Sequence, residues 1–235
     1  MKRLSPRSRS VTALLTLLLV SPLVGCTAYK VGGAIQSGRA ELRYGDPKVA
    51  LAYFQHAAEL DPDYRFSRSL WREGVWTYVG KAHYALGNRS KARAALERAR
   101  ELHPDDPIAR LYLGLVLARE GEQDRAIREI VAGLSGVKEW LEYADFNLSD
   151  GRFWDIDRRF RNRIDKTLET ISTGEFVWPE LISEAEWLGK ELEEEIERAR
   201  RRQLRDRRRD DDDQRRDRDR DRGSRSRDRG SRGRR

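Results

Sequence analysis

Residues 76–104 read WTYVGKAHYALGNRSKARAALERARELHP, and this stretch decides how the chain folds. Three of its small residues have counterparts of the same type 34 positions later, and the two sets are Gly80, Gly87 and Ala92, then Gly114, Gly121 and Ala126. Small residues let two helices cross closely, and Gly87 falls where a helix must stop. The pattern predicts a repeated unit of two antiparallel helices.

An earlier copy of the unit precedes these two, with Gly38, Gly45 and Ala50 in the matching places. Its offset from the second copy is 42 residues, so additional residues fall near 63–70. Two Asp-Pro pairs provide an N-cap followed by proline in the first turn of a helix. Asp46-Pro47 precedes the second helix of the first copy, and Asp106-Pro107 precedes the first helix of the third. Together these positions predict six helices, over residues 31–44, 47–60, 67–86, 89–102, 107–120 and 123–134.

The same stretch resembles the tetratricopeptide repeat (TPR), a family whose helix–turn–helix unit has a 34-residue period. The positions that match the family pattern are Trp76, Val79, Gly80 and His83 in the first helix, Ala92 and Leu96 in the second, and the closing Pro104. The resemblance implies an all-α, TPR-like helical-hairpin solenoid with about three repeats over residues 31–134. It also implies repeat packing at Gly38, Ala50, Gly80, Ala92, Gly114 and Ala126.

Residues 135–204 keep helical periodicity without the repeat, and they are expected to form a C-terminal helical cap because a solenoid end needs one. The cap is expected to begin with a short helix near 137–143. Two apolar stripes follow, one of Ile156, Phe160, Ile164, Leu168 and Ile171, and one after Trp178-Pro179 of Leu181, Ala185, Leu188, Leu192 and Ile196. The aromatic stretch DGRFWD at 150–155 is expected to pack these helices, with ligand binding as the open alternative.

Residues 205–235 contain 15 Arg and 9 Asp and almost no apolar side chain. Because such a segment cannot bury enough surface to offset the entropy of ordering, it is expected to be a disordered Arg/Asp-rich tail. Two roles stay open for it: a solubilising end, or a basic segment that binds an anionic envelope polymer such as peptidoglycan or lipopolysaccharide. The tail carries most of the net charge of +8, so this charge does not indicate a nucleic-acid-binding fold.

The N-terminus has the layout of a secretory signal peptide, with basic residues before the apolar run VTALLTLLLV at 11–20. The sequence LVGC, which ends at Cys26, resembles the lipobox of bacterial lipoproteins. The resemblance implies a signal peptide over 1–25, a palmitate-bearing Cys26, and a short linker over 26–30. Because Thr27 rather than Asp follows the cysteine, it further implies an outer-membrane anchor that faces the periplasm in a double-membrane bacterium.

In TPR domains the first helix of each pair lines a concave groove. The corresponding positions here are Ile35, Arg39, Leu42, Arg43, Thr77, Lys81, Tyr84, Ala85, Ile108, Leu111, Leu115 and Arg119. The cations among them, with Tyr84, would favour an acidic peptide or a C-terminal carboxylate. No Asn stands at the matching positions, so the carboxylate clamp of the best-known members is not expected. Alternatively, the cations are solvated, and helices within 137–204 cover the apolar positions of the third repeat.

The chain shows no signature of catalysis, metal binding or cofactor binding. One Cys and three His give no structural zinc pattern, and neither a nucleophile triad nor a glycine-rich phosphate loop is present. We therefore expect a non-enzymatic scaffold or adaptor, lipid-anchored and facing the periplasm, that binds other envelope proteins through its TPR groove. The alternative is an envelope tether whose basic tail binds an anionic polymer, with the helical part as a spacer.

Overall fold

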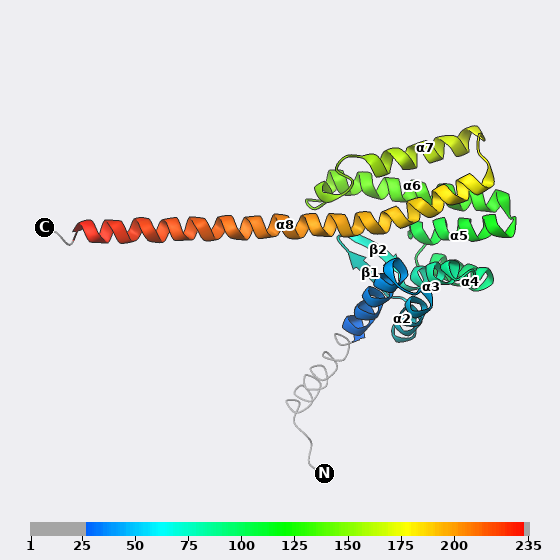
Figure 1. The fold of residues 1–235 in the computed structure, drawn as a ribbon, viewed down its shortest axis with the longest axis horizontal. Helices are drawn as coiled ribbons and strands as arrows, with labels where there is room; N and C mark the ends of the chain where they lie inside the picture. The colour runs from blue at the N-terminus through cyan, green and yellow to red at the C-terminus, as the bar shows by residue number, and fades with distance from the viewer. Residues whose placement is uncertain (1–26, 233–235) are drawn as a thin grey trace, which may run out of the picture.

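The computed structural model describes residues 27–232, which are helical except for one short β-hairpin and the connecting turns (Figure 1). A first helix covers residues 27–44. The elements that follow are α2 (Pro47–Leu60), β1 (Arg65–Arg68), β2 (Trp71–Gly74), α3 (Val75–Ala85), α4 (Arg89–Leu102), α5 (Pro107–Glu120), α6 (Gln123–Asn147), the 3-10 turn η1 (Gly151–Phe153), α7 (Arg159–Thr173) and α8 (Trp178–Arg232). The first helix with α2, α3 with α4, and α5 with α6 form the three helical pairs of an all-α, TPR-like solenoid.

Close contacts at three glycines define how the pairs pack. A Cβ atom on Gly38 would lie 2.5 Å from the ring of Phe54, and one on Gly80 would lie 2.5 Å from Leu96. At Gly114 the neighbour is backbone, because a Cβ atom would lie 2.8 Å from the amide nitrogen of Ile130. The alanines of the second helices are fully buried: Ala50, Ala92 and Ala126. The structure therefore places all six small residues at the crossings of the helical pairs.

The local signals for helix ends give three helices with the predicted bounds, namely α2, α4 and α5. Asp46 and Asp106 cap α2 and α5, with Oδ1 of each accepting a hydrogen bond from a first-turn N–H at 2.8 and 3.0 Å. Gly87 and Gly121 follow α3 and α5 with φ angles of 72° and 84°. Only glycine adopts this left-handed conformation without steric cost, so the helix stops predicted at these glycines are confirmed.

The prediction of one helix over 67–86 is wrong in its first part, because residues 65–74 form the antiparallel hairpin of β1 and β2. Phe66 and Trp71 are buried, while the residue that follows each of them, Ser67 or Arg72, is exposed, which is the two-residue period of a strand rather than the period of a helix. The insertion that lengthens the first repeat therefore forms a hairpin, and α3 begins only at Val75.

Two boundaries in the cap also differ from the prediction. The short helix expected near 137–143 is the end of α6, which runs unbroken through Gly133 and Gly136. A Cβ atom on either glycine would lie within 2.9 Å of the start of α5, so the two glycines permit a close crossing. Ile156 does not belong to the first cap stripe: it is 62% exposed and precedes α7, whose buried face begins at Phe160. The 150–155 stretch packs as expected, with Trp154 buried against Trp140 and Trp71.

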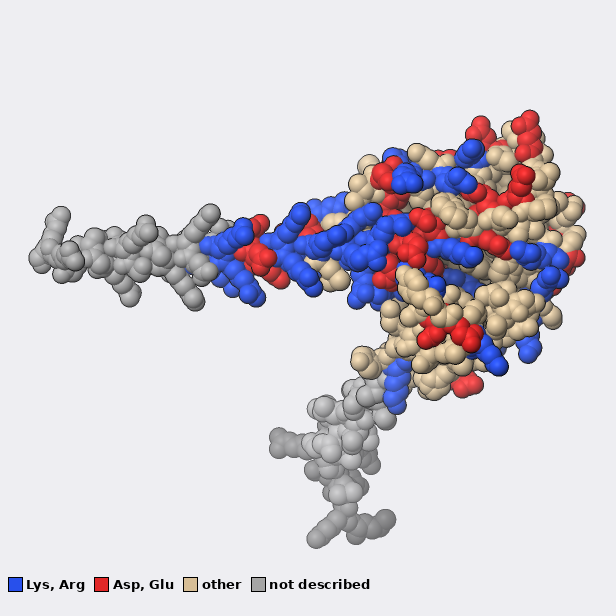
Figure 2. All heavy atoms as spheres, in the orientation of Figure 1, with Lys and Arg blue, Asp and Glu red and all other residues tan. Residues whose placement is uncertain are grey.

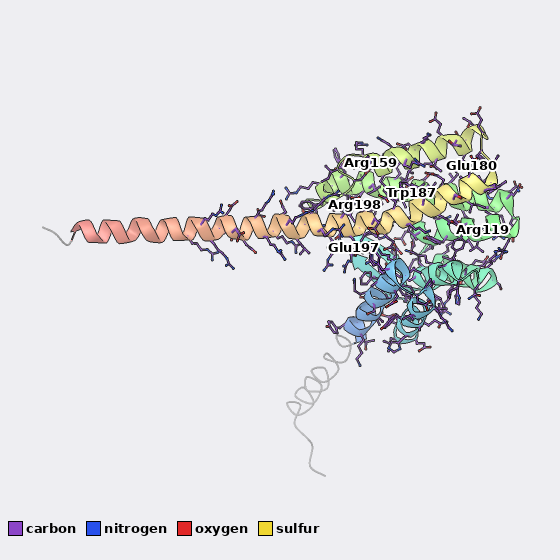
Figure 3. All side chains as sticks on the ribbon, viewed as in Figure 1. Arg119, Arg159, Glu180, Trp187, Glu197 and Arg198 are labelled. Atoms are coloured by element: carbon purple, nitrogen blue, oxygen red, sulfur yellow. The ribbon has the colours of Figure 1, made fainter. Side chains whose placement is uncertain are left out.

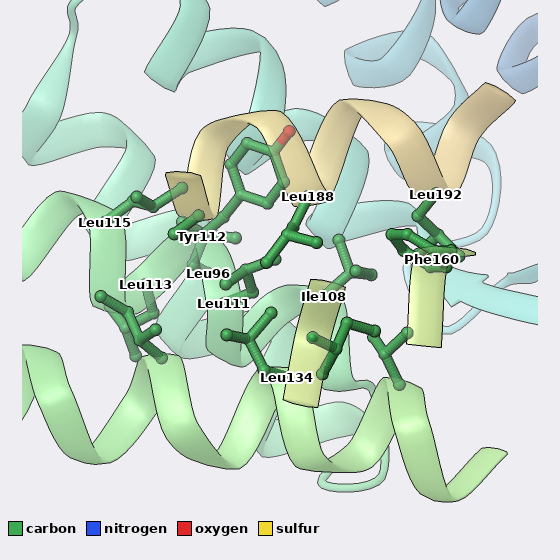
Figure 4. Close-up of a cluster of buried hydrophobic side chains, with 14 of the residues drawn as sticks. Leu96, Ile108, Leu111, Tyr112, Leu113, Leu115, Leu134, Phe160, Leu188 and Leu192 are labelled. Atoms are coloured by element: carbon green, nitrogen blue, oxygen red, sulfur yellow. The ribbon is translucent and has the colours of Figure 1, made fainter. Parts of the chain in front are cut away.

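The stripe predicted after Trp178-Pro179 is confirmed, because all five of its residues are buried: Leu181, Ala185, Leu188, Leu192 and Ile196. Figure 4 shows Leu188 and Leu192 of α8 beside Tyr112 and Ile108 of α5 and Phe160 of α7. The larger of the two hydrophobic clusters among the described residues is therefore shared by the repeats and the cap.

The disorder predicted for residues 205–235 differs from the structure over 205–232, where α8 continues as a straight helix to Arg232 (Figure 1). Residues 233–235 lie outside the described residues. Arginine is a good helix former, and a helix that is already nucleated extends at little cost. Every side chain from Arg207 to Arg216 is exposed, as expected for a segment with almost no apolar residues. No helix of the described residues is both long and apolar enough to cross a bilayer. The predicted signal peptide and Cys26 lie outside the described residues.

Candidate binding groove

Of the groove residues predicted from the repeat, four cations and a tyrosine lie on one face and point toward α8, whereas Thr77 donates a hydrogen bond to Asp106 at 2.6 Å. These five polar groove residues are Arg39 and Arg43 on the first helix, Lys81 and Tyr84 on α3, and Arg119 on α5. Figure 3 shows Arg119 on the side of α5 that faces the stretch of α8 carrying Trp187, and Arg119 lies 2.5 Å from Glu186 of that stretch. Each of the five binds a glutamate of α8, so the groove is occupied by a segment of the same chain.

The centre of the groove is a buried ionic cluster around Glu193. Arg39 donates from Nη2 to this carboxylate at 2.7 Å, and the Lys81 ammonium donates to its other oxygen. Lys81 also lies 3.3 Å from Glu73 at the end of β2, and Glu73 accepts a hydrogen bond from the Trp71 indole at 2.9 Å. Two cations therefore share two carboxylates, which is the pairing that a buried charge requires.

The pKa values of these two carboxylates are shifted in opposite directions, although burial alone would raise both. Burial alone would raise the pKa of Glu193, but the adjacent Lys81 and Arg39 outweigh it and lower that pKa to about 2. At Glu73 burial dominates over the attraction of Lys81 and raises the pKa to about 7. Glu193 is therefore the firmly charged partner that holds α8 in the groove, whereas Glu73 changes charge near neutral pH.

The rim of the groove is more solvated. Arg43 donates to Glu194 of α8 at 2.7 Å, and the Glu194 side chain is 38% exposed. Tyr84 and Arg119 both bind Glu186, and the Arg119 Nε–H donates to the Tyr84 hydroxyl at 2.8 Å. Burial and the bond to Glu186 raise the pKa of Tyr84. Ion pairs in such positions contribute little to stability, so the rim mainly orients α8.

The structure agrees with one half of the alternative that the sequence left open for the groove and contradicts the other half. The apolar third-repeat positions Ile108, Leu111 and Leu115 are buried in the cluster that includes α8, as the covering alternative predicted. The cations are not simply solvated, because they pair with acidic side chains. Sequence reasoning missed these partners, although the acidic run within 191–197 lies on the same helix as the apolar stripe.

A pocket of about 710 Å³ remains beside α8, between the C-terminal ends of the first helix, α3 and α5. Tyr84, Tyr112 and Trp187 give it aromatic walls. Arg89 and Lys190 also line it, and neither forms an ion pair or side-chain hydrogen bond within residues 27–232. Such a pocket has the chemistry to take a carboxylate next to an apolar group.

A family model described as tetratricopeptide repeat matches residues 80–134, from the middle of α3 into α6. No curated protein matches the chain. The match and the stacked helical pairs together show a TPR domain, and domains of this class generally act as non-catalytic scaffolds for protein–protein interaction. Among the described residues, no group of three or more His, Cys, Asp or Glu side chains is arranged to hold a metal ion.

Proposed function

We propose that this chain is a lipid-anchored, periplasm-facing TPR scaffold or adaptor that binds protein partners in a bacterial cell-envelope assembly, and that it is not an enzyme. The observation that carries the binding role is the pocket beside α8, which has aromatic walls and two cations, Arg89 and Lys190, that form no ion pair among the described residues. Because α8 already fills the centre of the groove, a partner would dock in this pocket rather than along the whole concave face.

The partner is an acidic peptide segment with at least one aromatic or aliphatic side chain. Arg89 and Lys190 would bind its carboxylates, and Trp187, which is 44% exposed, would contact its apolar group. The five polar groove residues are poor targets for a binding test, since most of them hold α8. Lys81, for example, is buried in the ionic cluster, and its replacement would disturb the fold before it disturbed a partner.

The test uses a photo-cross-linking amino acid at Ala85, an exposed residue of the pocket, in cells that express the full chain. One dominant protein adduct is expected. It should disappear in Arg89→Glu/Lys190→Glu and persist in Lys91→Glu/Arg201→Glu, which makes the same charge change at exposed sites of the same two helices outside the pocket. Equal loss in both double variants, or no dominant adduct, would overturn the proposal.

Membrane attachment is proposed from the lipobox-like sequence that ends at Cys26. Cys26→Ser should abolish palmitate labelling and shift the chain from the membrane fraction to the soluble fraction of the envelope. Retention in the membrane fraction with unchanged mass of the mature chain would exclude acylation at Cys26. This experiment is independent of the cross-linking test, so scaffold and anchor can fail separately.

The alternative function, a tether that binds an anionic polymer such as peptidoglycan or lipopolysaccharide, is favoured by a different observation. Over the stretch up to residue 216, the exposed part of α8 displays Arg side chains on both sides of the acidic cluster at 210–213 (Figure 2). Deleting residues 210–235 should abolish binding to the purified polymer and leave the Ala85 adduct intact if the chain is a tether. Unchanged polymer binding after the deletion would reject the tether.

A further inference from the structure

A second polar pocket, of about 230 Å³, lies where the tip of the β-hairpin meets α8, farther along the helix from the groove. Arg68 and two serines of the hairpin line one side of it, and Arg200 and Arg207 of α8 line the other. Three arginines from two separate elements therefore line one small space, and the guanidinium group of Arg68 donates hydrogen bonds to Glu197 and Gln36.

The positive charge in this pocket exceeds the negative charge that faces it. Glu197 is the main counter-ion, and it is shared among Arg68 at 2.9 Å, Arg39 at 3.4 Å and Arg200 at 3.9 Å. Arg207 approaches a carboxylate only at 4.0 Å, that of Asp150. Burial lowers the pKa of Arg68 against the opposing effect of Glu197, and the positive charges of Arg200 and Arg39 lower it further.

Uncharged donors stand in the same place. The Ser67 hydroxyl has no hydrogen-bond partner among the described residues. Gln203, which is 9% exposed, accepts a hydrogen bond from the Ser69 hydroxyl at 3.0 Å, and its buried amide nitrogen has no partner. An unsatisfied buried donor is costly to leave unpaired, and it is most simply satisfied by an acceptor that enters the pocket.

The hairpin turn that carries these groups is strained and held in place. Ser69 and Leu70 have backbone φ angles of 49° and 77°, which residues other than glycine rarely adopt. Besides the bond to Gln203, the Ser69 carbonyl accepts a hydrogen bond from the Trp154 indole at 3.1 Å. Strained backbone that neighbours hold from both sides is typical of functional positions.

We infer that the pocket between the hairpin tip and α8 is a binding site for a phosphate group. The tetrahedral oxyanion is bound by Arg200 and Arg207 with support from Arg68, and it accepts hydrogen bonds from the Ser67 hydroxyl and the Gln203 amide. Arginine forks match phosphate oxygens in geometry as well as in charge. The phosphate is either free in solution or part of a phosphodiester headgroup, and the site is independent of the protein-binding pocket.

The test follows the backbone amide signals of Ser67, Ser69 and Gln203, and the side-chain amide signal of Gln203, by NMR on the full chain. One titration uses inorganic phosphate and another uses glycerophosphoglycerol, a soluble phosphodiester headgroup, both at constant ionic strength set with sodium chloride. The variant is Arg200→Glu/Arg207→Glu. Its matched control is Arg201→Glu/Arg205→Glu, which makes the same charge change at exposed residues of the same helix outside the pocket.

We expect saturable shifts at these three residues, and the titration with the smaller dissociation constant identifies the source of the phosphate. The pocket variant should raise that constant about tenfold or more, as expected from losing two charge-assisted contacts, while the control stays within about twofold. Circular dichroism checks that both variants are folded. An equal effect of both variants, or no saturable shift with either probe, would overturn the inference.

Discussion

The inner segment of α8 (residues 178–203) and the outer segment (204–232) belong to one helix but are held by different forces. The inner segment buries an apolar residue in nearly every turn, and Glu193 is buried with them. In the outer segment, every side chain from Arg207 to Arg216 is exposed (Figure 2). Tertiary packing therefore fixes the inner segment, whereas the outer segment depends on helix propensity and on local pairs such as Asp213–Arg216.

The inner segment of α8 fills the TPR groove of its own chain, and the outer segment does not. The inner segment combines an apolar stripe for the third repeat with glutamates for the cations of all three first helices. The outer segment has an excess of arginine and no apolar stripe, so it cannot make either kind of contact with the groove. The change in charge and in apolar pattern therefore marks the point at which α8 leaves the packed helices.

The largest effect is expected at the buried centre of the inner segment. Glu193→Ala leaves Arg39 and Lys81 buried without their shared carboxylate, which should reduce the free energy of unfolding by about 3–5 kcal/mol. The matched control is Glu194→Ala, which removes the ion pair with Arg43 at the rim. This variant should lower the free energy of unfolding by no more than about 1 kcal/mol. Urea denaturation of both variants measures the difference. Equal costs would mean that the cluster does not anchor α8.

Much of this fold could be predicted from the sequence, because its signals are local. Helix caps at Asp46 and Asp106, and glycine stops at Gly87 and Gly121, act within a few residues. The same holds for the apolar stripe of the inner segment, whose period alone indicates a buried helix face.

The rest depends on contacts that local pattern does not encode. The residues that would line a TPR groove followed from the repeat, but the bond from Arg39 to Glu193 joins residues 154 positions apart. Likewise, Phe66 and Trp71 read as part of a helix until their pairing across the hairpin is known. The unbroken path of α6 depends on how closely α5 approaches Gly133, which is a tertiary property.

The two carboxylates of the ionic cluster differ in how they should affect stability as the pH changes. Glu73 has a folded-state pKa of about 7, above its ordinary value of 4.5, because it is buried. The folded state therefore binds this proton more tightly, and stability from this group is present below pH 4.5 and lost as pH rises through 7. Lys81, Arg39, Glu193 and Asp106 are the charged groups that face it.

We expect the chain to lose about 1–3 kcal/mol of unfolding free energy between pH 5 and pH 7.5 through this group. Glu73→Gln should flatten that loss, because the amide keeps an oxygen for the Trp71 indole and does not titrate. Glu101→Gln, at an exposed position, is the control and should follow the parent chain. Denaturant melts at the two pH values measure this, and a Glu73→Gln slope equal to the parent's would contradict it.

A smaller effect is expected at the rim of the inner segment. Tyr84→Phe removes the hydroxyl that binds both Glu186 and Arg119 while keeping the ring packed on Tyr112. Loss of this partly solvated hydrogen bond should cost about 1 kcal/mol. Tyr53→Phe, an exposed tyrosine on α2 without a hydrogen bond among the described residues, should cost nothing measurable. A loss above about 3 kcal/mol at Tyr84 would place the rim among the main anchors of α8.

The smallest effect is expected in the outer segment. Ending the chain after Arg209 removes a stretch in which every described side chain, at 210–216 and 218, is exposed, while it keeps Asp206 and Arg207, which lie near Arg152 and Asp150. The free energy of unfolding should change by less than about 0.5 kcal/mol, because no buried group is lost. The ellipticity at 222 nm should fall by the share of helix removed, since the outer segment contributes signal without stability. An unchanged total ellipticity would show that residues 210–232 are not helical in solution, whereas a marked loss of stability would show that they pack on the body.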